Sequence, residues 1–187
     1  MPQTTFLDEL VAAFRGLGAL ITGRSTAAGH FDFSQRGLVG SFIALLLATV
    51  LTAYGPQVFG LQTAPGAGSR AVVLALLLFA MQIGAAFLVL RQMNRLDGFV
   101  PYVVADNWMN LFLSAFGSAL LLATGPNDVV LLVIGIASIV VEVNIARRIV
   151  TLPPMQIVLF MIGQLAAQLL GVLLFGGLVV GPALSGG

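Results

Sequence analysis

The feature that most constrains this sequence is a set of five long apolar runs. The hydrocarbon core of a bilayer is about 30 Å thick, and an α-helix needs about 20 residues to cross it. The five runs are of that order of length and cover residues 37–54, 71–90, 102–124, 129–146 and 155–180. We therefore predict an all-α polytopic membrane protein with five transmembrane helices, called spans one to five here.

The charge content agrees with this prediction. Of the 187 residues, 8% are charged and 59% are hydrophobic, whereas about 25% of the residues of a soluble domain are charged. Seven acidic and eight basic side chains are too few to cover the surface of a soluble globule. The net charge of +1 excludes the basic footprint of a nucleic-acid-binding protein, and the absence of cysteine excludes disulfides and thiolate metal sites.

Glycine and proline mark the ends of the runs. Gly55-Pro56 follows span one, Pro101 precedes span three, and a proline pair precedes span five. Residues 125–128 alone separate spans three and four. Because so short a connection joins neighbouring helices, we expect these two spans to form an antiparallel hairpin.

The basic residues indicate the orientation in the membrane. All eight are arginines, which is typical of a GC-rich bacterial genome, and Arg70 alone would lie outside if the N-terminus is cytoplasmic. The others are Arg15, Arg24, Arg36, Arg91, Arg95, Arg147 and Arg148. Because cytoplasmic loops carry the excess of arginine, we predict a bacterial inner-membrane protein with its C-terminus in the periplasm. A four-span model without residues 129–146 would place Arg147 and Arg148 outside, and we reject it.

Residues 1–36 form a cytoplasmic segment distinct from the transmembrane domain of residues 37–187. Apolar residues recur there at helical spacing, namely Phe6, Leu7, Leu10, Val11, Phe14, Leu17 and Ile21. This pattern predicts an amphipathic helix that lies along the lipid headgroups, or one that docks on the cytoplasmic ends of the bundle. Asp8 and Glu9 precede any basic residue, so we expect no cleaved signal peptide.

Two spans carry small residues at four-residue intervals. Such residues let membrane helices approach closely, because lipid offers no hydrophobic driving force between helices. We therefore expect helix contacts at Gly40, Ala44 and Ala48 in span one and at Gly163, Ala167 and Gly171 in span five.

Span three carries a polar stripe, with Asp106, Asn110, Ser114 and Ser118 at successive intervals of four residues. A charged group at the centre of a lipid-facing helix costs about 2.5–3.5 kcal/mol, so the stripe is expected to face other helices or water. Spans two, four and five also carry polar residues, Gln82 among them. The intramembrane polar cluster that we predict comprises Asp106, Asn107, Asn110, Ser114, Glu142, Gln164 and Gln168.

The two acids of this cluster are expected to share one level in the membrane. Asp106 lies five residues after Pro101 and Glu142 five residues before Arg147, and a rise of 1.5 Å per residue puts both about 7 Å inside the cytoplasmic edge. One hypothesis is a structural charge network in which Asp106 and Glu142 pair with Arg91, Arg95, Arg147 or Arg148. The other is a proton- or cation-binding site in which Asn107, Asn110, Gln164 or Gln168 supply neutral ligands.

Enzyme signatures are absent from the sequence. The single histidine, His30, lies outside the spans, and no Gly-x-Ser-x-Gly or phosphate-binding loop is present. We predict no catalytic residues, no cofactor and no metal site.

Local motifs add a family resemblance over residues 36–180. The approach to span three is Gly-Phe-Val-Pro-Tyr-Val-Val-Ala (98–105), and Val-Glu-Val-Asn-Ile-Ala-Arg-Arg (141–148) leads to a proline-led last span. With the five-span layout, these stretches resemble the Yip1 family. The patch Val-Ala-Asp-Asn-Trp (104–108) is similar to one in alphaproteobacterial membrane proteins. The resemblance implies a non-enzymatic membrane organiser or adaptor.

Two functions are compatible with these observations. The first is a scaffold, adaptor or accessory subunit that contacts lipids and a protein partner, or a second copy of itself, within the membrane. The second is a small transporter or channel subunit with a polar path lined by spans three to five.

Overall fold

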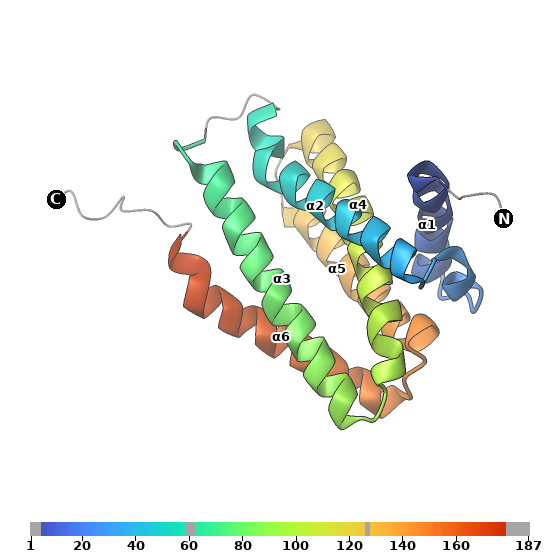
Figure 1. Cartoon of the computed structure of the whole chain (residues 1–187). Coiled ribbons are helices and arrows are strands. Elements are labelled where there is room, and N and C mark those ends of the chain that lie inside the picture. Colours follow the sequence, from blue (N-terminus) through green and yellow to red (C-terminus); the bar gives the residue numbers. More distant parts are fainter. Residues whose placement is uncertain (1–4, 59–62, 126–127, 179–187) are drawn as a thin grey trace.

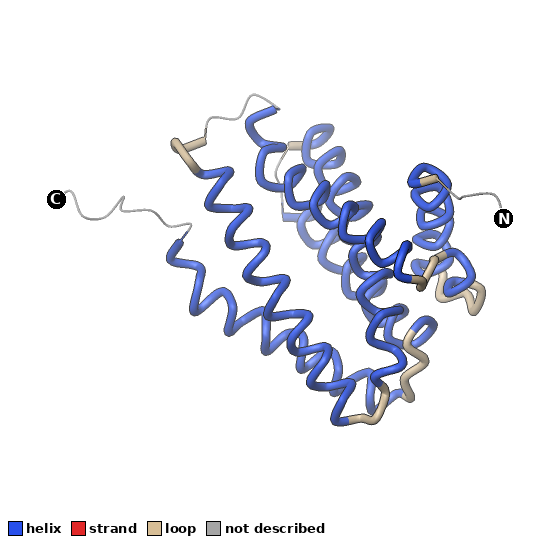
Figure 2. The backbone as a smooth tube through the Cα atoms, in the orientation of Figure 1, coloured by secondary structure: helices blue, strands red, loops and turns tan. Residues whose placement is uncertain are grey.

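The computed structural model describes residues 5–58, 63–125 and 128–178, and within these residues the chain is almost entirely helical, with no strand. Figures 1 and 2 show the helices and the short connections between them. The long helices are α1 (Phe6–Ile21), α2 (Gln35–Val58), α3 (Ala67–Gln92), α4 (Phe99–Thr124), α5 (Asp128–Asn144) and α6 (Pro154–Phe175). The short segments are η1 (Ala27–His30), η2 (Leu96–Gly98), η3 (Ile145–Ile149) and η4 (Gly176–Leu178).

Four of the described helices are long and apolar enough to cross a membrane: Gln35–Gly55, Ala67–Gln92, Asp128–Ile149 and Pro154–Phe175. Their outer surfaces expose large apolar side chains, such as Leu173 at 80% and Val129 at 70%. Such surfaces are suited to lipid rather than to water. Helix α4 is equally long but does not belong to this set, because Asp106 and its neighbouring asparagines lower its hydropathy.

Two helix pairs make the most extensive contacts, α2 with α4 and α3 with α6. Helix α5 packs beside α4, and α1 contacts α4 and α5 on the side away from α3 and α6 (Figure 1). The core is thickest around the first half of α4, where residues 102–109 are all buried. Tyr102 packs edge-on against Phe160 of α6, with ring centroids 5.0 Å apart. Helix α4 is therefore the central element that the other helices surround.

The helix boundaries differ from the predicted ones by a few residues, and the differences at the ends of α2, α5 and α6 are the most informative. Helix α2 continues past Gly55-Pro56 to Val58, because proline removes a single backbone N–H and the last turn accommodates that loss. Helix α5 passes into a π-helix, η3, which the hydrophobic pattern does not predict. Helix α6 ends at Phe175, and the predicted end of span five at residue 180 lies outside the described residues. The α4–α5 hairpin is confirmed, with Gly125 in the left-handed region at its turn (φ 74°).

Helix α1 begins with a capping box in which the hydroxyl of Thr5 accepts the N–H of Asp8. The Asp8 carboxylate in turn accepts the N–H of Thr5, and this hydrogen bond lowers the pKa of Asp8. Glu9 forms an ion pair of 3.4 Å with Arg36 at the start of α2, and burial raises the pKa of Glu9. Together these contacts fix the start of α1 and tie it to the bundle.

The predicted apolar stripe of α1 does not form a single face. Phe6, Leu10 and Leu17 pack against the core, whereas Leu7 and Phe14 are 67% and 63% exposed. Small residues of the same helix, among them Ala13 and Gly16, are buried against the bundle. Helix α1 therefore has one apolar face packed on the protein and another that is largely exposed.

Both runs of small residues lie in helix contacts. Ala44 and Ala48 of α2 are buried, and Gly40 faces the carboxylate of Glu9. In α6, a Cβ atom at Gly163 would lie 2.8 Å from Val89, and one at Gly171 would lie 2.6 Å from Leu78. Ala167, between them, is also buried. The glycines of α6 thus allow its close approach to α3.

Substitution of Gly163 by leucine is expected to separate α3 from α6. The new side chain would overlap the stiff β-branched Val89, and such overpacking costs about 1–3 kcal/mol of unfolding free energy. Unfolding in mixed micelles, followed by circular dichroism, measures the loss. Gly135→Leu is the matched control, because nothing lies within 4 Å of a Cβ atom at Gly135. Equal stability of the two variants would contradict this packing.

Candidate intramembrane polar groove

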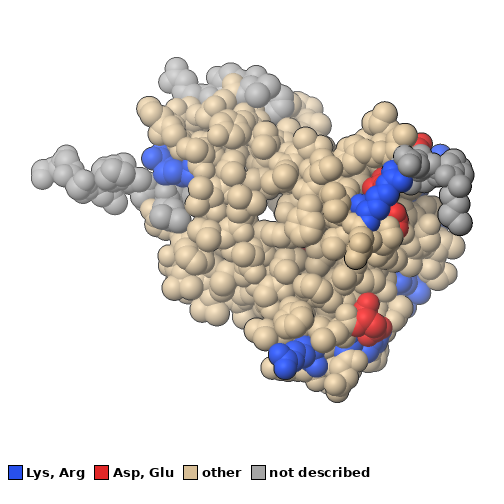
Figure 3. All heavy atoms as spheres, viewed as in Figure 1, with Lys and Arg blue, Asp and Glu red and all other residues tan. Residues whose placement is uncertain are grey.

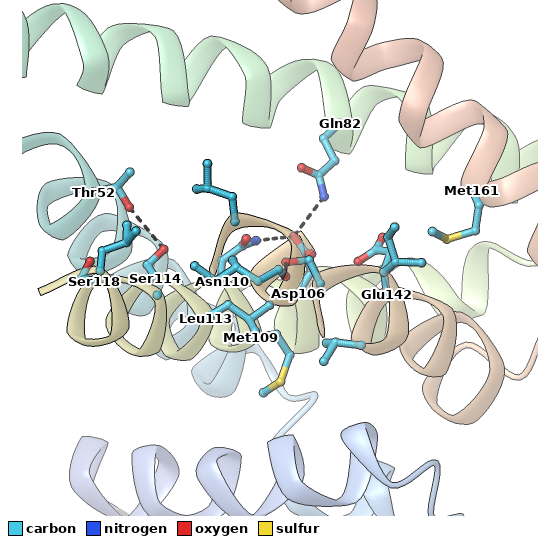
Figure 4. Close-up of a pocket in the computed structure, with 17 residues that line it drawn as sticks. Thr52, Gln82, Asp106, Met109, Asn110, Leu113, Ser114, Ser118, Glu142 and Met161 are labelled. Carbon is cyan, nitrogen blue, oxygen red and sulfur yellow. Dashed lines mark hydrogen bonds between the residues drawn. The ribbon is translucent and has the colours of Figure 1, made fainter. Parts of the chain in front are cut away.

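A cavity of about 510 Å³ lies between α4 and α5 on one side and α3 and α6 on the other. Figure 4 shows its polar residues and the apolar residues beside them. We call it the polar groove; its polar lining residues are Thr52, Gln82, Asp106, Asn110, Ser114, Ser118, Ser138 and Glu142. Its position between helix pairs matches a common location of ligand sites in helical bundles.

The polar residues are joined by hydrogen bonds from three helices. The side-chain amide of Gln82 in α3 donates to the Asp106 carboxylate (3.3 Å) and to the Tyr102 hydroxyl (3.0 Å). Asn110, one turn after Asp106, donates to the same carboxylate oxygen at 3.0 Å. From α6, the side-chain amide of Gln168 donates to the side-chain oxygen Oε1 of Gln82 at 3.0 Å. Figure 4 shows Gln82 pointing from α3 towards Asp106. These bonds connect the α3–α6 pair to α4.

The second acid belongs to the same network. The Tyr102 hydroxyl donates to Glu142 of α5 at 3.0 Å, and the carboxyl groups of Asp106 and Glu142 are close enough to hydrogen-bond to each other. Asp106 is only 4% exposed, whereas Glu142 is partly exposed in the groove. The structure therefore brings the two predicted acids together. A hydrogen bond between two carboxyl groups requires a proton on one of them.

The expected arginine partners of these acids lie elsewhere. Among the described residues, the ion pairs join Arg36 to Glu9 and Arg95 to Asp97, and neither reaches the groove. The guanidinium of Arg95 instead donates to the backbone carbonyl oxygens of residues 150 and 151. On the face in Figure 3, charged side chains gather at the edges of the molecule. The predicted pairing of Asp106 and Glu142 with Arg91, Arg95, Arg147 or Arg148 is therefore not found, because the acids face inwards from the ends of the spans.

A second cavity of about 210 Å³ extends the groove between α2 and α3. It shares Thr52, Gln82, Asn110 and Ser114 with the first cavity and adds Gln168. The hydroxyl of Thr52 donates to Ser114 at 3.3 Å where the two cavities meet. Polar side chains thus line a continuous strip along α4, from Asp106 towards its C-terminal half.

Two predicted members of the cluster lie outside the groove. Asn107 is fully buried in the contact between α2 and α4, where it donates to the Ser41 hydroxyl at 3.1 Å. Gln164 is 6% exposed, and its side-chain amide makes no hydrogen bond to the described residues. Asn107 faces a different direction from Asp106, because a shift of one residue turns a helix by about 100°.

Tyr102 and Thr52 belong to the site, although neither was predicted as a member of the polar cluster. Tyr102 precedes Asp106 by four residues and continues the polar stripe towards the start of α4. Its spacing was therefore sufficient to predict that it belongs to the site. Thr52 shares α2 with two other serine or threonine residues, Ser41 and Thr49, and the sequence does not indicate which of the three reaches the groove. Tyr102 matters most, because its hydroxyl links Gln82 to Glu142.

The described part of the chain contains no group of three His, Cys, Asp or Glu side chains that could hold a metal ion. The groove offers two carboxyl groups, a phenol, amides and hydroxyls. This set can bind a proton or one positive charge and can donate hydrogen bonds to a polar solute.

The all-helical fold and its four long apolar helices indicate a helical membrane protein. Comparison of the chain with protein-family models, with curated proteins and with solved structures finds no match in any of the three.

Proposed function

We propose that the chain is a five-span inner-membrane protein with a cytoplasmic N-terminus, in which α4 supplies the additional span. Helix α3 ends close to the start of α4, and α5 begins close to the end of α4. If α3 and α5 cross the bilayer, α4 carries the chain back between them, and its 26 residues extend about 39 Å at 1.5 Å each. The polar first half of α4 is buried by other helices, so it does not need the apolar surface of a lipid-facing span.

We propose further that the protein is a small transporter or channel subunit that binds its solute in the polar groove. The observation that carries this proposal is the Asp106–Glu142 pair, which lines a cavity of about 510 Å³ without an arginine partner among the described residues. A structural charge network would be compensated and closely packed. Ionisable residues within a membrane domain that have no such partner are candidates for solute or proton pathways.

A single cysteine placed in the groove tests this function. The natural chain has no cysteine, so the variant Ser118→Cys introduces the only thiol. Ser118 lines the groove, and we expect its replacement to react with a water-soluble maleimide in proteoliposomes. The control is Leu173→Cys, on the lipid-facing surface of α6, which we expect to react at least about tenfold more slowly because thiolates do not form in lipid. An inert Ser118→Cys variant would argue against a solvated path.

The exposed face of α1 favours a second candidate function. Leu7, Val11 and Phe14 form an apolar surface that stays largely exposed, although the ring of Phe14 also contacts Phe112 of α4 at its edge. A scaffold or adaptor, as the resemblance to the Yip1 family implies, would use such a surface to bind lipid headgroups or a partner. This candidate gains support if the groove is unreactive in the cysteine experiment and truncation of α1 releases a co-purifying protein.

A further inference from the structure

The charges in the polar groove are unbalanced. Two carboxyl groups face each other there, and the described residues that contact them are neutral: Gln82 from α3 and Asn110 from α4. Among the described residues, Tyr102 is the one further titratable group in contact, and it donates to Glu142. A buried carboxylate without a positive partner costs several kcal/mol, so a membrane protein keeps one only with a proton or a cation beside it.

The helices packed around the acids contribute neutral polar groups to the groove. From α3 the group facing Asp106 is the amide of Gln82, and from α6 it is Gln168, which reaches Gln82. From α2, Thr52 presents a hydroxyl further along the groove. Among the described residues, Arg147 is exposed beyond the end of α5 and Arg148 beside it is partly buried, and neither forms an ion pair with either acid. The positive charge that the site requires therefore comes from outside the chain.

The walls of the groove indicate what carries that charge. Beside the polar strip they consist of methionine, leucine and isoleucine side chains, including Met109, Met161 and Ile134. Methionine is flexible and polarizable, which suits the binding of ligands of varied shape. The cavity of about 510 Å³ lies within the range of about 300–1,000 Å³ that holds organic ligands. A bare inorganic ion would use the carboxyl groups but leave this apolar space without a role.

We infer that the polar groove binds an amphipathic organic cation with one positive charge, which contacts Asp106 and Glu142 while its apolar part lies against the methionine and leucine walls. This inference rests on the proposed function, since it names the class of solute. The carboxyl pair holds one proton in the empty groove. When the cation binds, that proton leaves to water and the cation takes its place, so one positive charge enters for each one released.

The test uses the full-length Ser118→Cys protein and two probes of matched size. Tetraphenylphosphonium is an amphipathic organic cation, and tetraphenylborate is an anion of nearly the same shape. We expect the cation to slow maleimide labelling of the introduced thiol by about tenfold or more, and the anion to leave the rate unchanged. We also expect one proton to be released per cation bound, and acidification to weaken the protection because protons compete for the same pair.

Two sets of variants assign the effect to the acids. Protection is expected to disappear in Asp106→Asn, in Glu142→Gln and in the double variant, and to persist in the control Asp128→Asn, an exposed acid at the start of α5. If the double variant does not fold, two other measurements decide whether the acids bind the cation. These are protection in the single variants and the pH dependence of protection when both acids are present.

The possible outcomes separate this inference from the proposed function. If maleimide labels the thiol and both probes protect equally, or neither protects, the groove is solvated but does not select cations, and the inference is wrong. Protection that survives neutralisation of both acids would also overturn it. A thiol that maleimide never reaches overturns the proposed function itself, and the inference with it.

Discussion

Replacement of Arg95 by alanine is expected to lower the unfolding free energy by about 2–4 kcal/mol, because it removes several charge-assisted hydrogen bonds at once. The guanidinium donates to the carbonyl oxygens of Val150 and Thr151 and to the Thr151 hydroxyl. These contacts join the α3–α4 connection to the η3–α6 connection. Thr151 has a left-handed backbone (φ 57°), which is unfavourable for a β-branched residue. The hydrogen bonds from Arg95 help to hold Thr151 in this conformation.

The measurement is reversible unfolding of the purified protein in mixed micelles. Arg91→Ala is the matched control, since Arg91 is exposed, lies one turn earlier and forms no hydrogen bond to the described residues through its side chain. Arg95→Lys should recover little of the loss, because an ammonium group cannot contact several acceptors as a planar guanidinium does. An Arg95→Ala protein as stable as the control would show that these contacts do not hold the two connections together.

The double variant Asp106→Asn with Glu142→Gln is expected to be more stable than the natural protein, by about 1–4 kcal/mol at mildly alkaline pH. The substitutions preserve side-chain size, and their amide oxygens can still accept hydrogen bonds from Gln82, Asn110 and Tyr102. They also remove the cost of burying acids that have no arginine partner among the described residues. Residues that a site keeps for function often lower stability in this way.

The same unfolding assay measures this effect, with Asp128→Asn as the control for removal of an exposed acid. If the acids belonged to a structural charge network, the double variant would be less stable than the natural protein, since neutralisation would then leave buried arginines unpaired. A double variant that is markedly less stable than the control would therefore favour a structural role for the Asp106–Glu142 pair.

The sequence predicted the helical elements because membrane spans are encoded by local composition. The runs of apolar residues place α2, α3, α5 and α6 to within a few residues, and the short link after Thr124 predicts the α4–α5 hairpin. The π-helix η3 could not be predicted, since it depends on how α5 joins α6 rather than on hydrophobic spacing. The face of α1 that packs on the bundle was also missed, because its small residues have low hydrophobicity and contribute through close approach.

For the site, the level of each residue along its helix was easier to predict than the direction in which its side chain points. The rise per residue correctly put Asp106 and Glu142 at one level, and the stripe of α4 correctly put Asn110 and Ser114 beside Asp106. Gln164 was grouped with the acids because it is a polar residue within a span, and the arginines were grouped with them by level. Their separation depends on the rotation of each helix about its axis, which only the packing of neighbouring helices determines.

The π-helix η3 also sets a constraint on the length of the chain. Each residue of an α-helix turns the chain by about 100°, so loss of one residue within Ile145–Ile149 would rotate everything that follows by that angle. Val150 and Thr151 would then turn away from Arg95, and the start of α6 would lose its register with α3. A change of one residue in the exposed turn at residues 63–66 would have no such effect. Insertions and deletions should therefore be tolerated between α2 and α3 and rejected between α5 and α6.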